Sequence, residues 1–193
     1  MVPRLLATLF LIAAFVLQMQ AQSKESGPPP SMSKPGPGSE RARLAFLVGE
    51  FTTATRVMSG RPGGKEALGT GTSSVRWGLD SMFLFIDEQS KNSMLGQYKG
   101  FGVLGFNHAS SQYTLAMYNN FGDSPEYHGA FSGDTLVMAT RVPFPGGSFD
   151  QKLFWFPEAG TVHLKVFNDM GKGPVQVVDQ VGHRSSAATG PDR

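Results

Sequence analysis

SQYTLAMYNNFGDSPEYHGAFSGDTLVMATRV, residues 111–142, contains three runs rich in apolar residues, separated by two turns. Tyr113, Leu115 and Met117 alternate with polar residues, which is the pattern of a strand with one buried and one solvated face. Between the runs lie the pairs Asn119-Asn120 and Gly133-Asp134, which are residue types typical of turns. The stretch therefore predicts three antiparallel strands joined by hairpins, at 111–118, 126–132 and 135–142.

The same spacing of short runs and turns extends over the rest of the chain from residue 50 to residue 184. The connections are too short for crossover helices, so neighbouring strands are expected to be antiparallel. Closing such a sheet removes its exposed edges. We therefore expect an all-β fold, an antiparallel up-and-down β-barrel of about ten strands that leaves room for a modest cavity. The further strands are predicted at 50–59, 66–77, 82–90, 95–106, 149–157, 161–168 and 175–184.

A short helix is expected before the first strand, from Ser39 as its N-cap to Leu47. Ala42, Ala45 and Phe46 fall at helical spacing, so this face is predicted to close one end of the barrel. Glycine pairs within the predicted strands mark places where the sheet is expected to bend; they are Gly69 with Gly71, and Gly100 with Gly102.

The barrel domain is predicted at 39–184, and the two ends of the chain are expected to lie outside it. Residues 1–23 have the layout of a secretory signal, with Arg4 before an apolar run and small residues for cleavage after Ala21 or Ser23. Residues 24–38 form a linker rich in Pro, Gly and Ser, and residues 185–193 a polar, disordered tail. The protein is thus expected to be exported, either periplasmic or secreted.

Two membrane-bound alternatives fit the sequence less well. The apolar run of the signal is shorter than the roughly 20 residues that span a bilayer. An outer-membrane barrel would need an apolar outer band, whereas charged residues such as Lys165 occupy the middle of predicted strands. We expect no stable membrane insertion after signal cleavage.

Composition excludes several classes of chemistry. The 193 residues include no cysteine, so lipoprotein anchoring, disulfides, thiol catalysis and cysteine-bound zinc are ruled out. The 17 basic residues nearly balance the 15 acidic ones, and loss of Arg4 with the signal would leave a net charge of +1. A nucleic-acid partner, which requires a concentrated basic face, is not expected.

No catalytic or metal-binding constellation is predicted. Residues 100–105 match G-x-G-x-x-G but lie inside a predicted strand, where the dinucleotide fingerprint does not function. Asp87 and Glu88 are adjacent, so they should point to opposite faces, and both are expected to be solvated. The four histidines are scattered singly. The chain is therefore expected to be a non-enzyme without a cofactor.

Ligand binding is the activity that the barrel interior favours. Methionine and phenylalanine recur through the strands and suit an adaptable apolar lining. Alternation places Tyr113, Met117 and Met138 inside, and these are the predicted ligand-binding residues. His183 shares parity with Val175 and Val181, so an alternative prediction makes it an inward axial ligand for haem.

Three phrases carry a resemblance to a known family: LVGEF at 47–51, GTSSVRW at 71–77 and GFGVLGFN at 100–107. Their order resembles a bacterial family of domains of unknown function, number fifteen seventy-nine, over roughly Arg43 to Arg184. The resemblance implies a barrel similar to the lipocalin and fatty-acid-binding group, without an established activity. The opening phrase is also similar to that of the nitrobindins, haem-carrying ten-stranded barrels, and this similarity implies His183 as the iron ligand.

The sequence thus leaves three functions open. The first is an exported, non-enzymatic carrier or sensor of a small apolar ligand held in the barrel. The second is a haem barrel with redox or nitric-oxide chemistry at His183. The third is a structural or interaction protein whose barrel is filled solid; no protein partner is indicated by the residues.

Overall fold

The computed structural model describes residues 38–60 and 64–185. The predicted signal, all of the predicted linker except Gly38 and all of the predicted tail except Ser185 lie outside the described residues. Within the described part of the chain, no helix is long and apolar enough to cross a membrane.

Ten antiparallel strands close into a barrel, in which each strand pairs with its neighbours in sequence and β1 pairs with β10. The prediction of an all-β, up-and-down barrel is confirmed, and most predicted bounds lie within two residues of the observed ones. The strands are β1 (Gly49–Met58), β2 (Glu66–Gly78), β3 (Phe83–Asn92), β4 (Gly96–Asn107), β5 (Gln112–Asn119), β6 (Glu126–Ser132), β7 (Thr135–Phe144), β8 (Gly147–Glu158), β9 (Thr161–Asp169) and β10 (Val175–Arg184).

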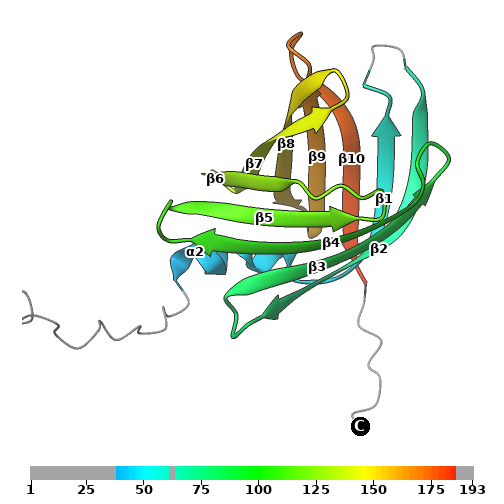
Figure 1. Ribbon diagram of the computed structural model, residues 1–193. Coiled ribbons are helices and arrows are strands. Elements are labelled where there is room, and N and C mark those ends of the chain that lie inside the picture. The colour runs from blue at the N-terminus through cyan, green and yellow to red at the C-terminus, as the bar shows by residue number, and fades with distance from the viewer. Residues whose placement is uncertain (1–37, 61–63, 186–193) are drawn as a thin grey trace, which may run out of the picture. The chain divides into compact units, whose positions relative to one another are not determined.

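The barrel is flattened into two faces whose strands cross. In Figure 1, strands β9, β10 and β1 run steeply across β3, β4 and β5, and the long strand β2 curves from one face to the other. The bend in β2 requires glycine, because a Cβ atom at Gly71 would lie 2.1 Å from the backbone oxygen of Gln89. A Cβ atom at Gly69 would lie 2.7 Å from the oxygen of Lys91. At this glycine pair the backbone of β3 approaches too closely for any residue with a Cβ atom.

The second glycine pair has a different use. A Cβ atom at Gly100 would lie 2.6 Å from the hydroxyl oxygen of Tyr98, and one at Gly102 would lie 2.7 Å from the sulfur of Met117. These two glycines leave room for neighbouring side chains inside the barrel. The whole G-x-G-x-x-G stretch lies within β4, as expected.

A helical segment closes one end of the barrel. It begins as α2 (Ser39–Ala42) and continues as the 3₁₀ helix η1 (Arg43–Leu47). Gly38, without a side-chain hydrogen bond, is the N-cap, so the capping role expected for Ser39 is wrong. The predicted face is only partly right: Phe46 is half-buried and packs against the core, but Ala42 and Ala45 are exposed, and the buried residues are Arg41, Leu44 and Leu47. Their spacing of three is the period of a 3₁₀ helix, in which residues i and i+3 share a face.

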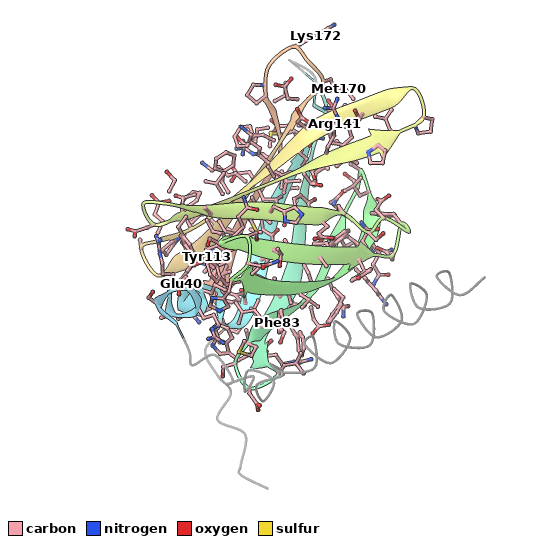
Figure 2. All side chains as sticks on the ribbon, turned by 60° about the vertical axis from the view of Figure 1, so that its left-hand side comes forward. Glu40, Phe83, Tyr113, Arg141, Met170 and Lys172 are labelled. Carbon is pink, nitrogen blue, oxygen red and sulfur yellow. The ribbon has the colours of Figure 1, made fainter. Side chains whose placement is uncertain are left out.

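Specific contacts hold this segment against the strands. The Tyr113 hydroxyl donates a hydrogen bond of 2.6 Å to the backbone oxygen of Glu40, and the two residues lie together beside the helix (Figure 2). The Arg43 guanidinium lies 4.0 Å from the ring centre of Phe131. From the end of β10, Arg184 donates to the backbone oxygens of Phe46 and Val48. Arg141, Met170 and Lys172 lie at the other end of the barrel (Figure 2).

Candidate functional site

The inward-facing side chains change from apolar to polar along the barrel. Near the helical segment they form a packed core whose fully buried members are Leu44, Leu84, Leu104, Leu115, Leu136 and Met138. Each fully buried side chain of this kind contributes about 1.5–3 kcal/mol to folding. Farther along the same strands several inward residues are polar, and the buried ones include Thr53, Thr55, Asn92 and Gln180.

A cavity lies where the apolar and polar parts meet. The empty space in and above it is about 460 Å³, a figure that includes open solvent, so the enclosed part is smaller. The polar side chains that line it are Thr53, Ser73, Glu88 and Gln180. The rest of the lining is apolar and comes from η1, β1, β2, β3, β8 and β9: Leu47, Phe51, Val75, Ile86, Trp155, Val162 and Leu164. Gly182 of β10 completes the wall.

Glu88 and Gln180 form a hydrogen-bonded pair in this cavity. The Gln180 side-chain Nε2 donates to Glu88 Oε1 at 2.9 Å, although β1 and β2 lie between their strands. The inward residues Thr53 of β1 and Gly71 of β2 are paired with each other. Because both are small, they leave room for the side chains of Gln180 and Glu88 to meet above them. Burial raises the pKa of the Glu88 carboxyl, and the hydrogen bond from Gln180 lowers it by a smaller amount.

Polar groups continue from Glu88 toward the open part of the interior. Burial raises the pKa of the Tyr98 hydroxyl, and the charge of Glu88 raises it further. Burial likewise raises the pKa of Tyr127 to about 12. The Tyr127 hydroxyl donates to Gln151, whose side-chain amide donates to Asn168 at 2.8 Å. The interior therefore offers a ligand both an apolar wall and a set of hydrogen-bonding groups.

Two threonine hydroxyls in β1 have no hydrogen-bond partner among the described residues. They belong to Thr53 and Thr55, which are 5% and 8% exposed. An unpaired buried hydroxyl costs about 1–3 kcal/mol. Thr53 lines the cavity, so a polar atom of a bound molecule placed there would relieve this cost.

The predicted ligand-binding residues lie in or against the core. Tyr113 and Met138 are 4% and 0% exposed and belong to the packed cluster, while Met117 packs against that cluster. Their inward orientation agrees with the predicted alternation. None of these three residues lines the cavity described above, whereas Glu88 does.

His183 does not face the interior. It is exposed and pairs with Thr52, which is also exposed, whereas the adjacent pair of Thr53 and Gly182 lines the cavity. The parity prediction failed because of a β-bulge in β10: Val175 pairs with Asn168 but Val178 pairs with Val166. The extra residue reverses the alternation for the rest of the strand. His183 is therefore not placed to hold haem iron inside the barrel.

Glu88 is the functional candidate that the sequence interpretation missed. Asp87 is exposed and lies 3.8 Å from Arg76, as a solvated carboxylate should. Glu88 faces the cavity, so the expectation that it is solvated is wrong. The available signal was its alternation with Leu84 and Ile86, both buried. Within the described ranges no group of three potential metal ligands occurs.

Comparisons with known proteins agree with this fold. The family described as "Protein of unknown function (DUF1579)" matches residues 36–177. The crystal structure of Rv2717c from M. tuberculosis is similar with a TM-score of 0.55 at 12% sequence identity, covering 77% of this chain and 99% of that one. At this identity the likeness concerns the fold. A comparison with curated proteins found no significant match.

Proposed function

The chain belongs to the DUF1579 family, and for this member we propose a non-enzymatic carrier or sensor that holds one small apolar ligand in the barrel cavity. The observation that carries the proposal is the hollow between the apolar core and Glu88, whose lining is mostly apolar with four polar side chains. Small-molecule sites are concave, mostly apolar and furnished with a few convergent polar groups. An exported location, which the N-terminal sequence favours, would suit a carrier or sensor.

Gly182 offers a way to fill the cavity without removing any side chain. It lines the cavity, and a Cβ atom there would meet Phe51 at 3.4 Å and the backbone oxygen of Val162 at 3.5 Å, which are ordinary contacts. Its backbone φ does not lie in the region reserved for glycine. Gly182→Ala should therefore fold normally, and Gly182→Leu should occupy the space of a ligand beside Phe51.

The test is a calorimetric titration of wild type, Gly182→Ala and Gly182→Leu with 2-naphthylmethanol, a neutral apolar probe. We expect about one site per chain in the wild type and in Gly182→Ala, and loss of most of the binding in Gly182→Leu. Urea unfolding checks that all three proteins are folded. Equal binding by wild type and Gly182→Leu would overturn the proposal, because the probe would then bind outside the cavity. No binding by the wild type would overturn it and favour a barrel with a solid core.

Recovery of the probe after incubation tests the non-enzymatic part separately. A carrier or sensor returns the molecule with unchanged mass. Chemical conversion of the probe that depends on Glu88 would instead identify an enzyme.

A further inference from the structure

The cavity contains an acidic group without a basic counterpart. Glu88 is the one ionisable side chain among the described residues that line it; the others are apolar or uncharged. The influences on the pKa of its carboxyl are burial and the hydrogen bond from the neutral amide of Gln180. Glu88 is half-buried, and a carboxylate largely removed from water without a positive partner is unfavourable; a cation brought by a ligand would supply that partner.

Three acceptor groups from three different strands face this cavity. They are the Glu88 carboxyl from β3, the Gln180 side-chain carbonyl from β10 and the Thr53 hydroxyl from β1. The Thr53 hydroxyl is buried and unpartnered among the described residues. A primary ammonium group has three N–H donors and no acceptor, so its requirements match these three oxygens.

We propose that the cavity selects a small apolar amine, whose hydrocarbon part lies along Phe51, Trp155 and Leu164 and whose protonated nitrogen lies beside Glu88. The inference rests on the proposed function and names the chemical class of its ligand. The aromatic side chain of Trp155, which lines the same cavity, is of a type that attracts cations as well. A carboxylate or phosphate head group would find no basic residue in the lining to neutralise its charge.

Proton uptake or release distinguishes this binding mode from apolar contact alone. Burial keeps Glu88 protonated to higher pH in the empty barrel, and an ammonium beside it favours the ionised form. Amine binding should therefore lower the pKa of Glu88 and release a proton at any pH where the carboxyl is protonated in the empty barrel. Tyr98 of β4 is the titratable group that interacts with Glu88, and Tyr127 of β6 interacts with Tyr98 in turn; burial raises the pKa of both hydroxyls, so both are neutral near pH 7. Strands β1, β2 and β10 present Thr53, Ser73 and Gln180, which do not titrate.

The experiment compares three probes of one shape: 2-naphthylmethylamine, 2-naphthylmethanol and 2-naphthoic acid. Each is titrated calorimetrically into the wild type, Glu88→Gln and the control Asp87→Asn, in two buffers of different ionisation enthalpy. Asp87→Asn removes the adjacent carboxylate, which points outward. Urea unfolding of each variant confirms that it is folded.

In the wild type and in Asp87→Asn the amine is expected to bind at least about tenfold more tightly than the alcohol, the acid most weakly, with proton release on amine binding. In Glu88→Gln the ratio of amine to alcohol affinity should fall toward one, without proton release. If the amine binds no better than the alcohol in the wild type, or keeps its preference in Glu88→Gln, the amine inference is wrong while the cavity function stands. If none of the probes binds the folded wild type, both proposals fail.

Discussion

Replacing Glu88 by glutamine should change how the stability of the protein depends on pH. The carboxyl ionises with a pKa of 4.5 in an unfolded chain, and burial raises this pKa in the barrel. Below pH 4.5 Glu88 is protonated in both states and adds no pH dependence. Above it the unfolded chain loses the proton first, so the folded state binds more protons and the free energy of unfolding falls as pH rises.

The size of the effect follows from proton linkage. One proton of difference corresponds to at most about 1.4 kcal/mol for each pH unit, from pH 4.5 up to the folded pKa of Glu88. Glutamine has nearly the same shape and can still accept the hydrogen bond from Gln180, but it does not ionise. The wild type should therefore lose stability relative to Glu88→Gln across this window, and the difference should level off above it.

Urea unfolding at half-unit steps from pH 4 to pH 9 measures this difference, since other titrating groups cancel between the two proteins. Asp87→Asn shows how much of any change comes from removing one charge from this strand. Parallel stability curves for wild type and Glu88→Gln above pH 4.5, or a wild type that gains stability relative to the variant, would refute the buried position of the carboxyl.

Three further predictions concern the barrel and its export. Gly129→Ala should destabilise the protein by about 1–3 kcal/mol, because a Cβ atom would lie 1.9 Å from a backbone oxygen of β7, and urea unfolding against Gly182→Ala checks this. Met138→Ala, at a fully buried core position, should cost about 2–5 kcal/mol in the same assay, and a loss below 1 kcal/mol would contradict tight packing there. Mass spectrometry of the protein from its host should show a mature chain beginning at Gln22 or Lys24, whereas an intact first residue on membrane-extracted material would exclude cleavage.

The fold was predictable because its pattern is local. Turn residues at short intervals and a two-residue alternation specify strands, and hairpin connections leave few ways to arrange them. The inward placement of Tyr113, Leu115 and Val166 follows from alternation alone. Features that depend on irregular backbone were not predictable: the 3₁₀ period that buries Leu44, and the bulge that turns His183 outward.

The candidate site was only partly predictable. The sequence favoured an interior ligand, but Tyr113 and Met138 belong to the packed core and Met117 packs against it, since burial and cavity lining have the same alternation. Glu88 shares that alternation with Ile86, yet its pairing with Gln180 joins residues that lie on opposite sides of β1 and β2. A contact between strands so far apart in sequence leaves no local signal.

The chain contains two tryptophans, and they provide an internal comparison for the central claim. Trp155 lines the cavity, whereas Trp77 packs against the core. Fluorine NMR of protein labelled with 5-fluorotryptophan, with Trp77→Phe to assign the signals, would follow both residues during titration with 2-naphthylmethanol. A ligand in the cavity should shift the Trp155 resonance, saturating at about one equivalent, and shift the Trp77 resonance much less. A titration that leaves Trp155 unshifted, or shifts only Trp77, would contradict a ligand-binding cavity at this position.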